Sequence, residues 1–459
     1  MNELLALSGT AQARLIREGA VSSEELVSAH LARIDEINPR LHAVVEVLRE
    51  PALQAAHAAD AVRARGGELG PLHGVPFSVK DSIEVAGTVC SAGTLGYRNA
   101  PPSKRDATLV ARLRASGAIP IARTNLPDLL FAFESDNLIH GRTNNPYDPD
   151  RTSGGSSGGE AALIAACGSP FGLGSDAAGS VRLPAHYCGI AALKPTSGRL
   201  PRTGHVPPAG GWIEALWQIG PMARHVEDLW TMMPLLLPPD GEDHTVIPMP
   251  YGDPGVVDVD HLRLAFFTDN GIASPDPETE ALVRRAALAL HAVEQRPPGI
   301  ERSYELEMQF LGPDGGDGVR EFLRAIGSER THPVLDGWLA KLERYRTSVE
   351  GFSRYWAELD SFRAGLHAFR QEYDAVLSPV AAHTALAHGA SVEEANFRGF
   401  SYTMTWNVAG WPAAVVRCGA TAAGLPIAVQ VAAAPWRDDI VLAVARRLEE
   451  AFGGWQAGA

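Results

Sequence analysis

The sequence predicts an α/β protein. Short apolar runs that suit buried strands, such as 75–79 and 118–122, alternate with stretches of helical spacing. A loop rich in glycine and serine at 152–159 opens directly onto an alanine-rich helical stretch at 160–166. Strands that alternate with helices in this way form a sheet covered by helices, and no internal repeat interrupts the pattern.

The first 65 residues are predicted to be helical. Ser22 and Glu25 have the spacing of a capping box, and apolar residues follow at mostly helical intervals. The Asn-Pro pair at 38–39 is predicted to end this helix, because the residue before a proline disfavours the helical conformation. A second, alanine-rich helix is expected over 51–65, with the glycine pair 66–67 as its stop signal.

The alternating pattern begins with the strand at 75–79, which leads straight into Lys80. Asp106 is expected to cap a helix that runs through Arg114 and stops at Gly117. The elements predicted next are strands at 118–122 and 170–174 and helices at 160–166 and 180–187.

The character of the chain changes over about 238–367, where proline-, glycine- and aspartate-rich turns separate charged helices at 335–346 and 352–367. This stretch is expected to be a peripheral helical cover that takes no part in the sheet. We expect one domain over 1–459, with N-terminal helices at 1–70, an α/β core at 71–237 and 368–459, and a variable, mostly helical insertion on the substrate side at 238–367. Within the returning core we predict strands at 374–379 and 424–430 and a helix at 439–452.

Composition excludes several classes of protein. With 45% hydrophobic and 20% charged residues the chain is an ordinary globular protein, and its net charge of -14 argues against broad nucleic-acid binding. No apolar run is long enough to span a bilayer, and no signal peptide is visible, so we expect a cytoplasmic protein without membrane association. The cysteines are far apart and are expected to be reduced and buried, with no metal and no cofactor: Cys90, Cys167, Cys188 and Cys418.

Three side chains are candidates for nucleophilic chemistry. Burial after an apolar strand would lower the pKa of Lys80 and leave a neutral amine that accepts a proton. Ser180 follows small residues that leave backbone N–H groups accessible, and a helix that begins there would add its positive end, which suits an oxyanion hole. Ser156 lies in the glycine-rich loop and could relay a proton between the other two. Together they predict a serine-dependent amide hydrolase.

Other interpretations of the same residues fit less well. Gly154 to Gly158 match the G-x-S-x-G nucleophile elbow formally, but a loop precedes them where that motif needs a strand. A phosphate-binding P-loop would need Gly-Lys-Ser/Thr, which is absent. A lone lysine is usually a surface charge, and a Gly-Ser pair is often only a helix cap. A catalytic histidine, such as His186 or His205, stays an alternative to a polar structural role.

The stretch Gly154 to Ala185 (GGSSGGEAALIAACGSPFGLGSDAAGSVRLPA) resembles the signature of the amidase signature family. The resemblance is strong over about 72–230 and again from 374 to the end, and weak across the segment between them. It implies a central twisted mixed β-sheet flanked by helices on both faces, with a helical insertion. The flanking pieces that agree are Leu72 to Asp81, Thr143 to Pro146, Gly220 to Arg224 and Gly424 to Pro426.

By this resemblance, Lys80 is similar to the family's general base, Ser180 to its acyl-accepting nucleophile and Ser156 to the bridging serine, which the family holds by a cis peptide bond. The resemblance also implies a hole for the oxyanion and a supporting polar set. The N–H groups of the hole would come from Ala177, Ala178, Gly179 and Ser180, and the supporting residues would be Ser157, Asp176 and Arg182.

Aromatic residues close to these motifs in the sequence predict an apolar pocket, bordered by the loop at 205–211. The candidate pocket residues are Phe131, Phe133, Gly155, Trp212 and Trp217. Such a pocket favours small, fairly apolar amides, including anilides, with carbamates (urethanes) and esters as further candidates. The binding partner that the sequence predicts is this small-molecule substrate. The chain could also form a homodimer, the commonest assembly of soluble proteins.

Two alternatives come from other classes. One is the glutaminase subunit of a tRNA-dependent amidotransferase, which works beside partner chains. The residues at 183–187 (LPAHY) look less like that branch, in which we expect Gln before the proline and Phe-Cys after it. The other is a catalytically inactive binding scaffold, which the intact Lys80, Ser156 and Ser180 argue against.

Overall fold

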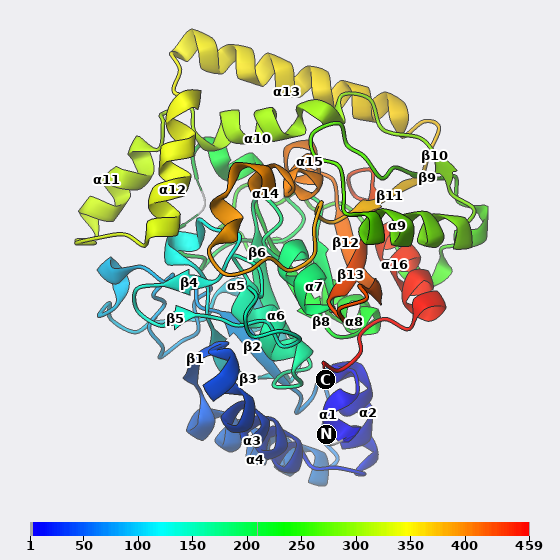
Figure 1. The fold of residues 1–459 in the computed structure, drawn as a ribbon. Coiled ribbons are helices and arrows are strands. Elements are labelled where there is room, and N and C mark those ends of the chain that lie inside the picture. Colours follow the sequence, from blue (N-terminus) through cyan, green and yellow to red (C-terminus); the bar gives the residue numbers. More distant parts are fainter. Residues whose placement is uncertain (1–2, 209, 459) are drawn as a thin grey trace.

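The computed structural model describes residues 3–208 and 210–458, except the side chains of Trp212 and Ala215. The described residues form one mixed sheet of eleven strands in the order β1-β3-β2-β6-β8-β7-β12-β13-β11-β9-β10, and β4 and β5 pair separately (Figure 1). The strands are β1 (Val44–Val47), β2 (Pro76–Lys80), β3 (Ile119–Thr124), β4 (Asp136–Asn137), β5 (Gly141–Arg142), β6 (Phe171–Asp176), β7 (Ala191–Lys194), β8 (Gln218–Ala223), β9 (Leu264–Phe266), β10 (Val293–Glu294), β11 (Ala375–Pro379), β12 (Ala413–Ala420) and β13 (Pro426–Ala433).

Helices cover both faces of this sheet. Successive residues of a strand point to opposite faces, and because the apolar residues of both faces must be buried, a hydrophobic core lies on each side. In β12, Ala413 and Val415 face one core and Ala414 and Val416 face the other. The helices are α1 (Glu3–Ala6), α2 (Gly9–Glu18), α3 (Ser23–Leu41), α4 (Arg49–Ala64), α5 (Thr108–Ala115), α6 (Gly158–Ala165), α7 (Arg182–Cys188), α8 (Val226–Leu236), α9 (Pro277–Ala289), α10 (Ser303–Leu311), α11 (Asp317–Ala325), α12 (Pro333–Leu342), α13 (Val349–Phe369), α14 (Glu394–Arg398), α15 (Ser401–Ala409) and α16 (Asp438–Phe452). The predicted α/β class is confirmed.

The N-terminal helices follow the predicted signals, with one difference. Ser22 and Glu25 form the capping box that starts α3, each side chain bonding to the other's backbone N–H. The prediction that the helix ends at Asn38-Pro39 is wrong, because α3 continues to Leu41. Pro39 lies in the last turn, where its missing N–H costs one hydrogen bond, and His42 N still donates to Asn38 O at 2.8 Å.

Asp106 does not cap α5, although the sequence predicts that it would. The helix begins at Thr108, and the residue at its cap position, Ala107, makes no side-chain cap bond. Asp106 Oδ1 instead accepts a hydrogen bond from Ala86 N, and its Oδ2 pairs with Arg114. The carboxylate therefore ties α5 to the loop after β2.

The segment 238–367 is mostly helical, and α13 crosses the top of the view in Figure 1, at the opposite end from α3 and α4. The prediction that it takes no part in the sheet is wrong for two short strands. β9 pairs in parallel with β11, and β10 pairs in parallel with β9, so both extend one edge of the sheet. These strands are only three and two residues long, too short to predict as strands from sequence.

Strands β7, β8 and β12 were not predicted, although they lie at the centre of the sheet. All four cysteines are buried and form no disulfide bond among the described residues, as expected. No helix in the described part of the chain is long and apolar enough to cross a membrane.

Candidate active site

Lys80 is the last residue of β2, and its side chain is fully buried. Its Nζ lies 2.6 Å from Ser156 Oγ and 3.1 Å from Ser175 Oγ, both within hydrogen-bond distance. Burial holds the pKa of Lys80 well below its usual value, although the charges of Asp176 and Glu160 oppose this shift. A buried amine of this kind can be neutral at ordinary pH and can accept a proton from the neighbouring hydroxyl.

Ser156 is presented by the loop that precedes α6. The peptide bond between Gly155 and Ser156 is cis, as the family resemblance implies. Residue 155 must be glycine, because a Cβ there would lie 2.5 Å from Glu134 N. The next side chain, Ser157, lies 3.3 Å from Ser175 O and 3.4 Å from Ser175 N, and so ties this loop to the end of β6.

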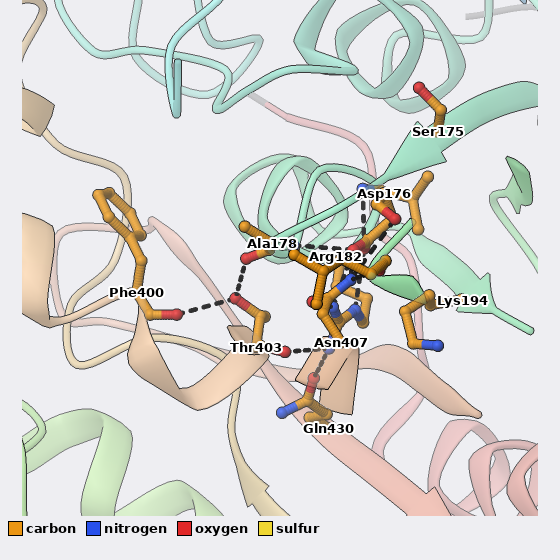
Figure 2. Close-up of polar contacts among 12 residues, drawn as sticks. Ser175, Asp176, Ala178, Arg182, Lys194, Phe400, Thr403, Asn407 and Gln430 are labelled. Carbon is orange, nitrogen blue, oxygen red and sulfur yellow. Dashed lines mark hydrogen bonds and ion pairs between the residues drawn. The ribbon is translucent and has the colours of Figure 1, made fainter. Parts of the chain in front are cut away.

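Ser180 lies on the loop between β6 and α7 and is 7% exposed. The loop is held by Asp176 and Arg182, which are completely buried and form an ion pair with two hydrogen bonds of 2.9 Å. The ion pair lowers the pKa of Asp176 despite its burial. Figure 2 shows the remaining guanidinium contacts, which are to Thr403 O, Asn407 Oδ1 and Gln430 Oε1.

Gly179 lets this loop approach α15. Its φ of +124° is strained for any residue with a side chain, and a Cβ there would collide with the hydroxyl of Thr403. The same hydroxyl donates a 2.7 Å hydrogen bond to Ala178 O (Figure 2). The backbone before Ser180 is therefore held in place by the side chain of Thr403, which is more than 200 residues away in the sequence.

The four expected oxyanion N–H groups are not equivalent. The Gly179 N–H donates a 2.8 Å hydrogen bond to Asp176 Oδ1. This differs from the expectation that the Gly179 N–H binds the oxyanion, because the buried carboxylate already accepts its hydrogen. Within the described chain no hydrogen bond uses the N–H groups of Ala177, Ala178 or Ser180. These three are the donors left for an incoming oxygen.

Replacing Arg182 by methionine is expected to lower the free energy of unfolding by about 3–5 kcal/mol, because it leaves the Asp176 charge buried without its partner. Urea unfolding of wild type and variant measures this. Arg182→Lys is the matched control: it keeps the charge but not the planar fork, and it should recover only part of the loss. An unfolding free energy within about 1 kcal/mol of wild type for the methionine variant would contradict this account.

Ser156 and Ser180 open on one cavity of about 100 Å³. Of the predicted pocket residues, Phe131, Phe133 and Trp217 line it, and Gly155 does not, because it packs against the backbone of 132–134. The side chain of Trp212 lies outside the described residues. The loop at 205–211, which was expected to border the pocket, contributes His205, Pro207 and Pro208. The lining residues not predicted for the pocket are Leu129, Leu130, Ala132, Ser175, Ile213, Leu311 and Trp338, beside Asp176, Ala177 and Ala178.

Sequence reasoning placed the insertion on the substrate side but named none of its residues for this wall. Trp338 of α12 packs against Phe133 with ring centroids 5.3 Å apart, and Leu311 ends α10. A second cavity of about 270 Å³ shares Phe131 and Leu311 with the first and extends to α11. No local pattern marks these residues for a pocket, because tertiary packing alone brings them to the serines.

The two candidate catalytic histidines have different surroundings. His186 is buried in α7, where one ring nitrogen lies 3.2 Å from His383 O and the other accepts from Ala428 N at 3.0 Å. It therefore has a structural role. His205 lines the cavity, with Nε2 3.0 Å from Ser175 Oγ. No group of three or more His, Cys, Asp or Glu in the described residues could hold a metal ion.

The site therefore combines a buried lysine hydrogen-bonded to a serine, a second serine on a loop with free N–H groups, and an apolar cavity beside both. This arrangement has the groups that nucleophilic hydrolysis of an amide needs. Comparison with known proteins agrees. The family model described as Amidase matches residues 25–442. The chain therefore belongs to the amidase signature family, and it is an amidohydrolase.

Relatives of different activities are similarly close. Indoleacetamide hydrolase of Bradyrhizobium diazoefficiens is 34% identical over 462 residues, which cover 96% of this chain and 86% of the relative. A glutamyl-tRNA(Gln) amidotransferase subunit of Synechococcus sp. (strain WH7803) is 31% identical over 473 residues, which cover 95% of this chain and 95% of the relative. A solved structure of fatty acid amide hydrolase is 25% identical, with a TM-score of 0.89 over 98% of this chain and 86% of that one. These comparisons identify the family and fold and leave the substrate open.

Proposed function

We propose that Ser180 is the nucleophile of this amidohydrolase and that Ser156 and Lys80 form its proton relay. The 2.6 Å contact between Lys80 Nζ and Ser156 Oγ carries the proposal, because it joins a buried amine to a hydroxyl at the cavity that Ser180 also lines. Neutral Lys80 accepts the Ser156 proton while Ser156 takes the proton of Ser180, which attacks the substrate carbonyl.

The remaining steps use the same groups. The N–H groups of Ala177, Ala178 and Ser180 stabilise the oxyanion of the tetrahedral intermediate. Ser156 then returns a proton to the departing amine, which leaves an acyl group on Ser180. Water enters, Ser156 and Lys80 take its proton, and the acid is released with Ser180 restored.

The substrate is proposed to be a small, neutral, fairly apolar amide, such as an anilide, with carbamates and esters as further candidates. The cavity supports this, because its walls are aromatic and aliphatic. Apart from the serine hydroxyls, the ionisable side chains among the described lining residues are those of Asp176 and His205. The Asp176 carboxylate already accepts hydrogen bonds from Arg182, Gly179 and Asn407. We also propose that the 238–367 insertion supplies the substrate-side wall, through Leu311 and Trp338.

The second candidate function is that of a glutaminase subunit in an amidotransferase complex, which the 31% identity to such a subunit favours. Glutamine carries an ammonium and a carboxylate, and burying either without a partner costs several kcal/mol. The described lining of the cavity offers no unpaired charge to receive them. The LPAHY sequence at 183–187 also departs from what we expect of that branch.

The purified chain alone is expected to hydrolyse a p-nitroanilide with kcat/KM at least about 100-fold above that for glutamine, because glutamine's two charges find no counter-charge. An aryl carbamate assayed in parallel measures how far carbamates are accepted, and Ser180→Ala serves as the blank. Release of ammonia from glutamine alone, or activity only with added partner chains, would favour the amidotransferase function.

A further inference from the structure

His205 lies at the far end of a hydrogen-bonded chain that begins at Ser156. Ser156 Oγ is 2.6 Å from Lys80 Nζ, Lys80 Nζ is 3.1 Å from Ser175 Oγ, and Ser175 Oγ is 3.0 Å from His205 Nε2. His205 is 6% exposed and reaches this position because its loop pairs with Ile83, directly after β2. The proposed mechanism uses Ser156 and Lys80 and assigns nothing to Ser175 or His205.

The contacts of His205 decide where its proton lies. Nδ1 is 3.0 Å from Pro207 O, and a carbonyl oxygen can only accept, so Nδ1 carries the hydrogen. Burial outweighs the hydrogen bond to Pro207 O and lowers the pKa of His205 to about 3, so the ring is neutral near pH 7. Nε2 therefore presents a lone pair, and the hydroxyl of Ser175 donates to it.

This orientation matters for Lys80. A neutral amine has two hydrogens and one lone pair. If the Ser175 hydroxyl pointed its hydrogen at Lys80, it would occupy the lone pair that must accept the Ser156 proton. With that hydrogen directed to His205, Ser175 Oγ can only accept from Lys80, and Ser175 O, 3.5 Å from Nζ, accepts as well. The lone pair of Lys80 is then left for Ser156.

We propose that His205 is a positioning residue that acts through Ser175 to direct the lone pair of Lys80 toward Ser156. The inference rests on the proposed function of Lys80 as the base. It assigns to His205 no contact with the reacting atoms and no proton transfer of its own. Loss of His205 is therefore expected to lower kcat more than it changes KM, because the residue controls the direction of the Lys80 lone pair in the proton relay.

The surroundings of His205 provide controls. Ser82 Oγ is 3.2 Å from the same Nε2 and makes no hydrogen bond to Lys80 in the described part of the chain, so Ser82→Ala is expected to keep kcat within about twofold of wild type. The imidazole also packs on Trp217, with ring centroids 4.5 Å apart. A purely structural role of His205 would act through that packing and would not depend on Ser175.

The test is a double-mutant cycle on the anilide substrate. His205→Leu is expected to lower kcat by about 10- to 100-fold with KM within about threefold, because an orienting group of a proton relay is lost. His205→Gln, whose amide oxygen can accept from Ser175, should recover at least about half of that loss on a logarithmic scale. In a Ser175→Ala background, His205→Leu should cost no more than about threefold.

Each other outcome overturns the inference. These are a leucine variant with kcat within twofold of wild type, effects of His205→Leu and Ser175→Ala that multiply, or a glutamine variant that folds but recovers nothing. His205→Met is measured alongside as a second apolar variant, and thermal melting shows which variants fold. Ser180→Ala on the same substrate separates the two proposals: if that variant keeps activity, the proposed function fails, and if only the His205 variants behave like wild type, this inference alone fails.

Discussion

Replacing Ser180 by alanine is expected to lower kcat for the anilide by at least about 10⁴-fold, with KM nearly unchanged. The acyl group needs an oxygen at this position, and the loop that carries it is fixed by Asp176, Arg182 and Thr403. Residual rate over water would come from the N–H groups and from substrate binding. Steady-state release of nitroaniline measures the loss.

A covalent probe makes this result specific to the residue. Wild type treated with a fluorophosphonate should gain one adduct, on the peptide that contains Ser180, and Ser180→Ala should gain none. Ser153→Ala is the matched control, because Ser153 lies in the loop before α6 with its hydroxyl buried and unpartnered among the described residues. It should keep kcat within about threefold. Activity retained by Ser180→Ala would contradict the assignment and would move the nucleophile to Ser156.

Replacing Lys80 by methionine is expected to lower kcat by about 10²- to 10⁴-fold, the usual contribution of a general base. The variant should fold. Because burial lowers the pKa of Lys80 in the folded state, the unfolded chain binds this proton more tightly, and that difference opposes folding below the unfolded pKa. Methionine carries no proton and so removes this cost of folding. The free energy of unfolding of the variant, measured in urea, should be at least as large as that of wild type.

The pH profile identifies the base. For wild type, kcat/KM is expected to rise with pH, because the fraction of neutral Lys80 grows as pH passes through its lowered pKa, and to fall tenfold per pH unit below it. Lys194 is the matched control. It is also fully buried, with its pKa lowered by burial to about 7, but its Nζ donates to Pro195 O. Lys194→Met should keep the acid limb, and Lys80→Met should lose it. A flat wild-type profile from about pH 6 to 9 would contradict a neutral lysine base.

Glu160 titrates within the pH range of this profile and needs its own check. Burial raises its pKa to about 7, and it accepts hydrogen bonds from Ser78 and Thr124. Glu160→Gln preserves the shape of the side chain and removes the titration. If the acid limb disappears in that variant and persists in Lys80→Met, the limb belongs to Glu160 and the proposed relay is wrong.

Local signals predicted much of the secondary structure. The capping box at Ser22 and Glu25, the strand that delivers Lys80 and the glycine-serine loop before α6 are all present, because each depends on neighbours a few residues away. The same local rules misplaced the end of α3 at Pro39 and the cap of α5 at Asp106. At α3 the helix tolerates the one hydrogen bond that Pro39 removes from its last turn, and at α5 the Asp106 carboxylate bonds to the loop after β2 and not to the start of the helix.

Strands at the centre of the sheet were harder to predict than those near the motifs. β7, β8 and β12 are paired on both sides in an order far from their order in the chain. Most of their residues are apolar on both faces, as in a doubly covered sheet, so no alternation of apolar and polar residues distinguishes them from a buried helix. The expected twisted mixed sheet came from the family resemblance and not from these segments.

Lys80, Ser156 and Ser180 lie in contiguous motifs, so the sequence was enough to predict the class of the protein and the residues proposed for its chemistry. The surroundings of these residues depend on the tertiary structure. It gave the Gly179 N–H to Asp176, brought Trp338 from the insertion to the cavity wall, and set His205 against Ser175. The physical reason is that burial, shape and the direction of a hydrogen bond depend on atoms from distant parts of the chain, which meet only when it is folded.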